Sequence, residues 1–159
     1  MRVHLGADHA AFEVKNQVVE ALRAAGHELV DHGPFSYDET DDYPAFCLRA
    51  AEGVARDPDS MGVVLGGSGN GEQIAANKVR GVRAALAWNE ETARLARLHN
   101  DANVISVGAR QHDPAEVIAL IETFLVTPYS DEPRHDRRIG MISRYEQTGE
   151  LPPLPASGR

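Results

Sequence analysis

Short apolar runs alternate with longer amphipathic segments along most of this chain, and that alternation restricts its fold more than any other feature. Five runs have the length and apolar content of β-strands: residues 2–5, 28–31, 61–65, 84–88 and 104–107. Helices are predicted over residues 10–25, from Pro44, from Asn89, from Pro114 and over residues 133–148. Strands separated by helices form a parallel sheet that is covered on both faces. We therefore predict an α/β fold, a Rossmann-like three-layer sandwich with a five-stranded parallel sheet, plus a C-terminal helix.

The size and charge of the chain narrow the classes of protein to which it can belong. Its 159 residues suffice for one sizeable core, and we predict a single domain over 1–149 and an unstructured proline-rich tail over 150–159. The 24 acidic and 16 basic residues leave a net charge of −8, which opposes binding to nucleic acid or to an anionic membrane. Apolar runs such as 117–121 are far shorter than the roughly 20 residues of a membrane span.

The cysteine content and the first residues predict the cellular compartment. Cys47 is the single cysteine, which excludes an internal disulfide and is typical of a reducing compartment. Its apolar neighbours predict a buried core thiol and not a nucleophile. The first residues lack the apolar core of a secretory signal, so we expect a cytoplasmic protein.

Polar residues follow three predicted strands at the edge where open parallel sheets bind their ligands. Asp8 and His9 follow the first strand, residues 66–72 follow the third and Arg110 follows the fifth. Asp8 and His9 could equally cap the first helix, and Arg110 could equally pair with surplus acidic residues. We expect a ligand site at this edge of the sheet.

The segment Gly66-Gly-Ser-Gly-Asn-Gly-Glu72 is the most informative stretch of the sequence. Its glycines allow a tight turn that presents backbone N–H groups at a helix start, which suits an anion. It matches neither the P-loop nor the dinucleotide-binding pattern, so it could also be a turn that needs glycine for its geometry. Glu72 could offset the helix dipole or remove a proton from a bound substrate. The Ser68 hydroxyl could stabilise developing charge or make a local turn hydrogen bond.

Histidine and arginine side chains supply further candidates in the second half of the chain. His99, followed by Asn100, ends the helix that starts at Asn89, so it could be a helix cap or a general acid. Arg134 and Arg138 are spaced i and i+4, so their guanidinium groups could bind a phosphate dianion or pair with acidic residues. The remaining histidines lack the spacing of metal ligands, so we predict no metal site.

Five ordered motifs resemble the type B ribose-5-phosphate isomerase family, which also includes isomerases of sugar 6-phosphates. The motifs are Gly6-Ala-Asp-His9, Asp42-Tyr-Pro44, residues 66–78, His99-Asn-Asp-Ala-Asn-Val104 and Arg134-His-Asp-Arg-Arg138. The resemblance covers roughly residues 1–148. It implies interconversion of an aldose and a ketose phosphate through a cis-enediolate, without a metal or another cofactor. It also implies a homodimer with two sites, each built from residues of both chains.

The resemblance further implies roles for individual residues. His99 would open the sugar ring with the help of Asp8, and Glu72 would move a proton between C2 and C1. The enediolate oxygens would be stabilised by Ser68 and by the loop residues Gly67, Gly69, Asn70 and Gly71. The positions that match substrate-binding residues of the family are His9, Asn100, Arg110, Arg134 and Arg138.

One position departs from the common pattern of that family. Many members have a cysteine as the proton-abstracting base where this chain has Gly66, and Cys47 is too far along the chain to be its counterpart. The chain is therefore similar to a branch in which Glu72 takes over as the base. The expected reaction interconverts D-ribose 5-phosphate and D-ribulose 5-phosphate. Two alternatives stay open: an isomerase of a six-carbon sugar 6-phosphate, and a non-catalytic sugar-phosphate-binding protein.

Overall fold

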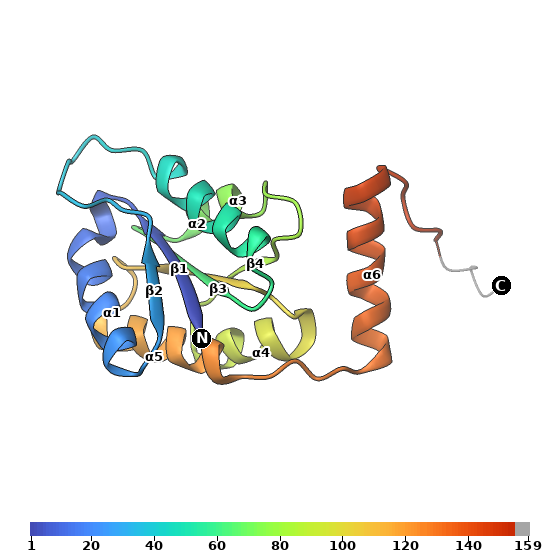
Figure 1. The fold of residues 1–159 in the computed structure, drawn as a ribbon. Coiled ribbons are helices and arrows are strands. Elements are labelled where there is room, and N and C mark those ends of the chain that lie inside the picture. The colour runs from blue at the N-terminus through green and yellow to red at the C-terminus, as the bar shows by residue number, and fades with distance from the viewer. Residues whose placement is uncertain (155–159) are drawn as a thin grey trace. The chain divides into compact units, whose positions relative to one another are not determined.

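The computed structural model describes residues 1–154 and contains the predicted five-stranded parallel sheet (Figure 1). The strands are β1 (Arg2–Ala7), β2 (Glu28–Asp31), β3 (Met61–Gly66), β4 (Ala84–Leu86) and β5 (Val104–Gly108). Their order across the sheet is β2-β1-β3-β5-β4, and all neighbouring pairs are parallel. The five predicted runs are confirmed, although β4 ends two residues earlier than the pattern predicts.

Helices connect the strands as the periodicity predicts. They are the short 3-10 helix η1 (His9–Ala11), α1 (Phe12–Ala24), α2 (Pro44–Arg56), α3 (Asn70–Ala76), α4 (Glu90–Asn100), α5 (Pro114–Val126) and α6 (Pro133–Thr148). Local capping explains several of their starts. The Asn89 side chain accepts a hydrogen bond from Thr92 N and so begins α4, and Asp113 does the same for α5 through Glu116 N.

Two helical layers cover the sheet, and the alternation of side chains along each strand decides which layer a residue meets. On β3, Val63 and Leu65 enter the core shared with α1, α4 and α5, whereas Val64 enters the core shared with α2 and α3. Figure 1 shows these layers on opposite sides of the sheet. The α2 layer approaches closely because β1 carries Gly6, where an added Cβ would lie 2.6 Å from Phe46 O. The predicted three-layer sandwich is confirmed.

The strand order reverses between β1 and β3, and this reversal places the candidate site. The chain runs from β1 out to β2 and then returns past β1 to β3. Connections that diverge in this way leave a crevice beyond the carboxyl ends of the two strands. Because β5 pairs with β3 on its other side, residues that follow β1, β3 and β5 meet at one edge.

The chain divides into two compact units, and each is described by itself. The first is Met1–Tyr129 and contains the whole sheet; the second begins at Ser130 and contains α6, with the predicted bounds. In the second unit, His135 is buried and its Nδ1 lies 2.9 Å from Ser130 Oγ. The single domain over 1–149 stays a prediction. So does the unstructured tail over 150–159: residues 150–154 belong to no helix or strand, and residues 155–159 lie outside the described chain.

Candidate active site

A pocket of about 470 Å³ opens at the carboxyl ends of β1, β3 and β5, where the sequence predicts a ligand site. It brings together predicted residues from three separate parts of the chain. Its lining residues are Asp8, His9, Ala10, Tyr43, Gly67, Ser68, Gly71, Glu72, Arg110 and Gln111. A concave site with several converging polar groups is the usual setting for binding a small polar ligand.

The glycine-rich loop between β3 and α3 is fixed by contacts with β5 and with the residue that follows it. Ala109 N donates to Gly66 O over 2.8 Å, and the buried Ser106 hydroxyl donates to Gly69 O over 2.7 Å. Gly69 itself adopts a left-handed conformation with φ of 80°, and an added Cβ there would lie 2.7 Å from Leu86 Cδ1. The loop therefore needs glycine for its geometry, and its anchored backbone also borders the pocket.

Glu72 occupies the space that a side chain at position 66 would fill. An added Cβ on Gly66 would lie 1.9 Å from Glu72 Oε1 and 2.1 Å from its Cδ. The residue is only 4% exposed, and this burial raises the pKa of its carboxyl group, with the charge of Asp8 adding to the rise. Hydrogen bonds from backbone N–H groups act in the opposite direction. A carboxylate with raised basicity at the pocket wall has the properties of a general base.

Asp8 caps a helix, which is one of the two interpretations that the sequence leaves open, and its side chain also lines the pocket. Its carboxylate accepts a hydrogen bond of 3.0 Å from Ala10 N at the start of η1. The side chain is buried, and desolvation raises the pKa of its carboxyl group. Burial therefore raises the pKa of both carboxyl groups, Asp8 and Glu72, that line this pocket.

His9 is held by a carboxylate from the loop that precedes α2. Asp41 Oδ1 accepts from His9 N over 2.9 Å and lies 2.8 Å from His9 Nδ1. The hydrogen bond to Asp41 raises the pKa of the His9 imidazole, and the charge of Asp8 adds to this effect. Asp41 thus fixes the ring and favours its cationic form, which suits an anionic ligand.

Two pocket residues are placed as the sequence suggests, but with local contacts of their own. The Ser68 hydroxyl accepts from Asn70 N over 3.3 Å and from Asn70 Nδ2 over 3.2 Å, which is the local turn bonding that the sequence allows. Arg110 is exposed at the mouth, and its Cδ would lie 3.4 Å from a Cβ on Gly67.

Cys47 lies outside this pocket. It is fully buried, and burial raises the pKa of its thiol, so the prediction of a core thiol is confirmed.

Comparison with known proteins places the chain among sugar isomerases. The family profile described as Ribose/Galactose Isomerase matches residues 3–142. The chain belongs to this family. It is 57% identical over 157 residues to the ribose-5-phosphate isomerase B of Mycolicibacterium paratuberculosis, with 99% of each chain covered.

Solved structures of the ribose/galactose isomerase family also resemble this chain. A crystal structure of ribose-5-phosphate isomerase B from Mycoplasma genitalium, with bound ribulose-5-phosphate, superposes with a TM-score of 0.89 and 38% identity, covering 92% of this chain and 97% of that one. The type B enzyme of Trypanosoma brucei gives a TM-score of 0.85 and 46% identity, with 90% and 97% covered.

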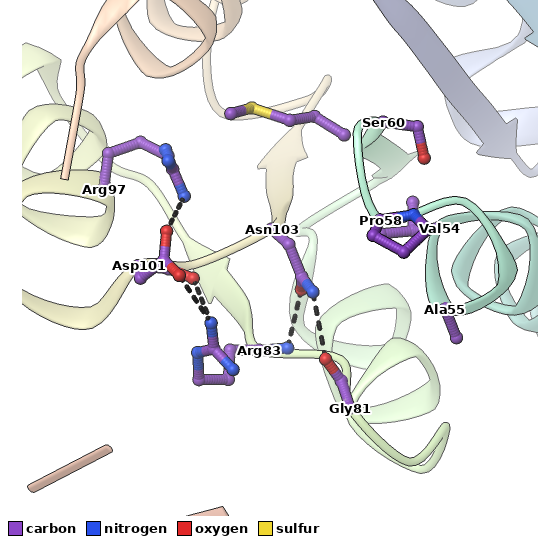
Figure 2. A pocket seen from close by; sticks show the side chains of 10 residues that line it. Val54, Ala55, Pro58, Ser60, Gly81, Arg83, Arg97, Asp101 and Asn103 are labelled. Atoms are coloured by element: carbon purple, nitrogen blue, oxygen red, sulfur yellow. Dashed lines mark hydrogen bonds and ion pairs between the residues drawn. The ribbon is translucent and has the colours of Figure 1, made fainter. Parts of the chain in front are cut away.

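Within a single chain, His99 and Asn100 do not lie in the pocket that contains Glu72. They end α4 at the opposite edge of the sheet, where Arg83, just before β4, donates to Asn100 O over 2.9 Å. Figure 2 shows this edge, with Arg83 and Asp101 facing each other. The five residues of β5 separate the two edges by about 16 Å, at about 3.3 Å per strand residue. Any chemistry that joins His99 to Glu72 therefore needs a second copy of the chain.

Arg134 and Arg138 belong to the second unit, and both are exposed on α6. Arg134 Nε lies 2.8 Å from Glu132 Oε2, an ion pair of the kind that the sequence offers as the alternative to phosphate binding.

In the described chain, residues 1–154, no three His, Cys, Asp or Glu side chains gather as they would around a metal ion. Over the same residues, no helix combines the length and apolar character needed to cross a membrane.

Two pocket residues, Tyr43 and Gln111, and the His9 partner Asp41 have no individual signal in the sequence. Asp41 lies 32 residues from His9, in an acidic turn that could equally be a solvated loop. Tyr43 belongs to a motif of the resemblance, but its place follows only from the fold, where its ring lies 2.6 Å from a Cβ added to Gly71. The turn after β5 supplies Gln111.

Proposed function

We propose that this protein is an aldose–ketose isomerase that interconverts D-ribose 5-phosphate and D-ribulose 5-phosphate through a cis-enediolate, with Glu72 as the base. Membership of the family and full-length identity of 57% to a ribose-5-phosphate isomerase B support the reaction and its substrate. The pocket at the carboxyl ends of β1, β3 and β5 supports the proposed location of the reaction. A homodimer in the cytoplasm is part of the same proposal.

The assignment of Glu72 as the base is supported most directly by its position, because its carboxylate fills the space that a side chain on residue 66 would occupy. A side chain at position 66 and the Glu72 carboxylate exclude each other, because a Cβ would lie within 2.1 Å of two carboxylate atoms. A cysteine at that position in other family members would therefore present its thiol close to where this chain presents a carboxylate. The raised pKa of Glu72 makes it a stronger base than an exposed glutamate.

In the proposed reaction, Glu72 transfers one proton between two neighbouring carbons. The carboxylate removes the proton from C2 of the open-chain aldose, and the electron pair forms the C1–C2 double bond as O1 becomes an oxyanion. The backbone of residues 67–71 and the Ser68 hydroxyl stabilise this charge. Protonated Glu72 then delivers the proton to C1, while the O2 hydroxyl proton passes to O1 and leaves the C2 ketone.

The phosphate is bound by cationic groups at the mouth of the same pocket. His9, whose cationic form is favoured by its bond to Asp41, and Arg110 supply two of them from one chain. Arg134 and Arg138 complete the clamp in the assembled dimer. Their i, i+4 spacing on α6 gives two guanidinium groups on one helix face, which suits a dianion.

The ring of the substrate is opened by residues that two chains contribute. His99 from a second copy acts as the acid on the ring oxygen, Asp8 assists, and Asn100 binds a sugar hydroxyl. The distance between the two edges of the sheet supports this division, because His99 and Glu72 of one chain lie at opposite ends of the strands.

The proposed function is tested by assaying five- and six-carbon sugar phosphates side by side in deuterated water. We expect turnover of ribose 5-phosphate with deuterium incorporation, and slower turnover of the six-carbon substrates. Faster turnover of a six-carbon sugar 6-phosphate would contradict the substrate assignment. Thermal stabilisation by the ligand without any exchange would identify a binding protein and contradict catalysis.

A further inference from the structure

The edge of the sheet opposite the proposed active site contains a second hollow, which is built around two arginines and one aspartate (Figure 2). It has a volume of about 340 Å³ and lies between the start of β4 and the end of α4. Arg83, Arg97 and Asp101 supply its charged groups. None of the three belongs to the reaction as described above, although Asp101 directly follows Asn100.

Arg83 binds the end of α4 through three separate hydrogen bonds. Its Nε donates to Asn100 O over 2.9 Å, and its Nη2 donates to Asp101 O over 2.7 Å and to Asp101 Oδ2 over 3.0 Å. The last carbonyls of a helix have no partner within the helix, so a guanidinium group that binds them fixes the position of the terminus.

Arg83 is itself held in place from the main chain. Its backbone N–H donates to Asn103 Oδ1 over 2.8 Å, and Asn103 Nδ2 donates to Gly81 O over 2.9 Å. Figure 2 shows these contacts beside the ion pairs. The guanidinium group therefore projects from an anchored position directly before β4, and the end of α4 is tied to the rigid sheet.

Asp101 turns the chain sharply at the end of α4, and two arginines hold it there. Its φ of 42° lies in the left-handed region, which is uncommon for residues other than glycine, asparagine and aspartate. The second oxygen of its carboxylate accepts from Arg97 Nη1 over 2.7 Å, and Arg97 Nη1 also donates to Ala102 O. The carboxylate thus bridges a buried arginine and a partly exposed one.

We propose that Arg83 and Asp101 are positioning residues, which lock the end of α4 so that His99 and Asn100 reach the sugar bound by a second copy of the chain. This inference rests on the proposed function, in which His99 is the ring-opening acid. His99 lies one residue before the carbonyl that Arg83 binds, so a shift of this terminus moves the imidazole. A misplacement of about 1 Å in a reacting group can cost about 100-fold in rate.

The signature of misplaced His99 differs from that of a damaged base. Ribose 5-phosphate is mostly a closed furanose, whereas ribulose 5-phosphate cannot close such a ring because its O5 carries the phosphate. Ring opening is therefore required to convert the aldose, but not for exchange of the C1 hydrogen of ribulose 5-phosphate with solvent. That exchange needs only the base and the oxyanion site.

The test compares Arg83→Met and Asp101→Asn with wild type in two assays, conversion of ribose 5-phosphate and deuterium incorporation at C1 of ribulose 5-phosphate. Asp101→Asn keeps a residue that tolerates the left-handed backbone but removes the charge that both arginines bind. Arg94→Met is the matched control, because Arg94 lies on α4, the helix that carries His99, and pairs with Glu91. Melting temperatures report whether each variant is folded.

We expect both variants to lose about 10- to 100-fold in kcat for ribose 5-phosphate, with exchange in ribulose 5-phosphate within threefold of wild type. Arg94→Met should match wild type in both assays. In a His99→Ala background, Arg83→Met should cost less than threefold more, because both changes act through the same imidazole.

Two results would overturn the inference while leaving the proposed function intact. One is unchanged conversion of ribose 5-phosphate by both variants. The other is an equal fall of conversion and exchange, which would indicate general structural damage in either variant, whatever its melting temperature. Absence of exchange in the wild type, in contrast, would refute the proposed function itself.

Discussion

Replacing Gly66 by alanine should displace the proposed base without unfolding the protein. The added Cβ would lie 1.9 Å from Glu72 Oε1, whereas real Cβ contacts essentially never fall below 3.0 Å, so the carboxylate must retreat by about 1 Å or more. The clash involves the far end of a flexible side chain, which can rotate away. The backbone at Gly66 has no left-handed conformation that alanine would strain.

The expected loss follows from the role of a general base. Such a group contributes about 10² to 10⁴ in rate, which corresponds to about 2.7 to 5.4 kcal/mol in the activation barrier. Gly66→Ala should therefore lower kcat for ribose 5-phosphate by at least about 100-fold. The KM should change much less, because His9 and Arg110, which we propose bind the phosphate, lie on other segments.

Turnover and thermal unfolding are measured on Gly66→Ala beside a matched glycine substitution. Gly140→Ala is suitable, because a Cβ there meets no atom within 4 Å. We expect Gly140→Ala to keep full turnover and both variants to unfold cooperatively. If folded Gly66→Ala kept kcat within threefold of wild type, the Glu72 carboxylate at this position could not be the base.

Three further predictions concern titratable groups. Burial raises the pKa of Glu72 in the folded protein, so the ionised carboxylate disfavours folding at higher pH. In denaturant titrations, the free energy of unfolding of Glu72→Gln should therefore rise relative to that of wild type between pH 4 and pH 8. A difference between the two proteins that does not change with pH would contradict this prediction. Asp41→Asn removes the hydrogen bond that raises the His9 pKa, so the KM for ribose 5-phosphate near pH 7.5 should rise by roughly three- to tenfold. Asp38→Asn is the control: Asp38 bonds Thr40 and interacts with His9 only through its charge, so this change should raise the KM much less. The stacked rings of His4 and His32 both have a lowered pKa, mainly because of burial, so folding favours the neutral rings. The free energy of unfolding should fall as the pH drops below about 6.5, by up to ~1.4 kcal/mol per pH unit for each ring. His32→Asn should make this pH dependence shallower, and an unchanged dependence would refute the role of the pair.

Local sequence signals predicted much of the fold because their causes are local. Asn89 and Asp113 are good N-caps wherever they occur before amphipathic segments, and both cap the helices that the sequence predicts. Gly69 lies in a turn that only a residue without a Cβ can make, and the glycine pattern marks it. The strand runs carry their own apolar pattern, which is why all five are found.

Contacts between distant segments explain what the sequence does not reveal. Asp41 meets His9 only because the loop before α2 folds over the end of β1. The exchange of β4 and β5 in the strand order depends on how connections pack, and no single segment encodes it. The motif that contains His99 gives no sign that its own chain places it at the edge opposite Glu72. Gly66 and Glu72 are both visible in the sequence, but their shared space appears only in three dimensions.

Isotope exchange by Glu72→Gln shows whether the Glu72 carboxylate moves the proton between C2 and C1. Glutamine keeps the shape and most contacts of glutamate but cannot accept the proton, so the pocket should still bind ribulose 5-phosphate. We predict that deuterium incorporation at C1 of ribulose 5-phosphate falls by about 10² to 10⁴ relative to wild type, with little change in affinity. Exchange at a near wild-type rate in a folded Glu72→Gln variant would show that Glu72 is not the base.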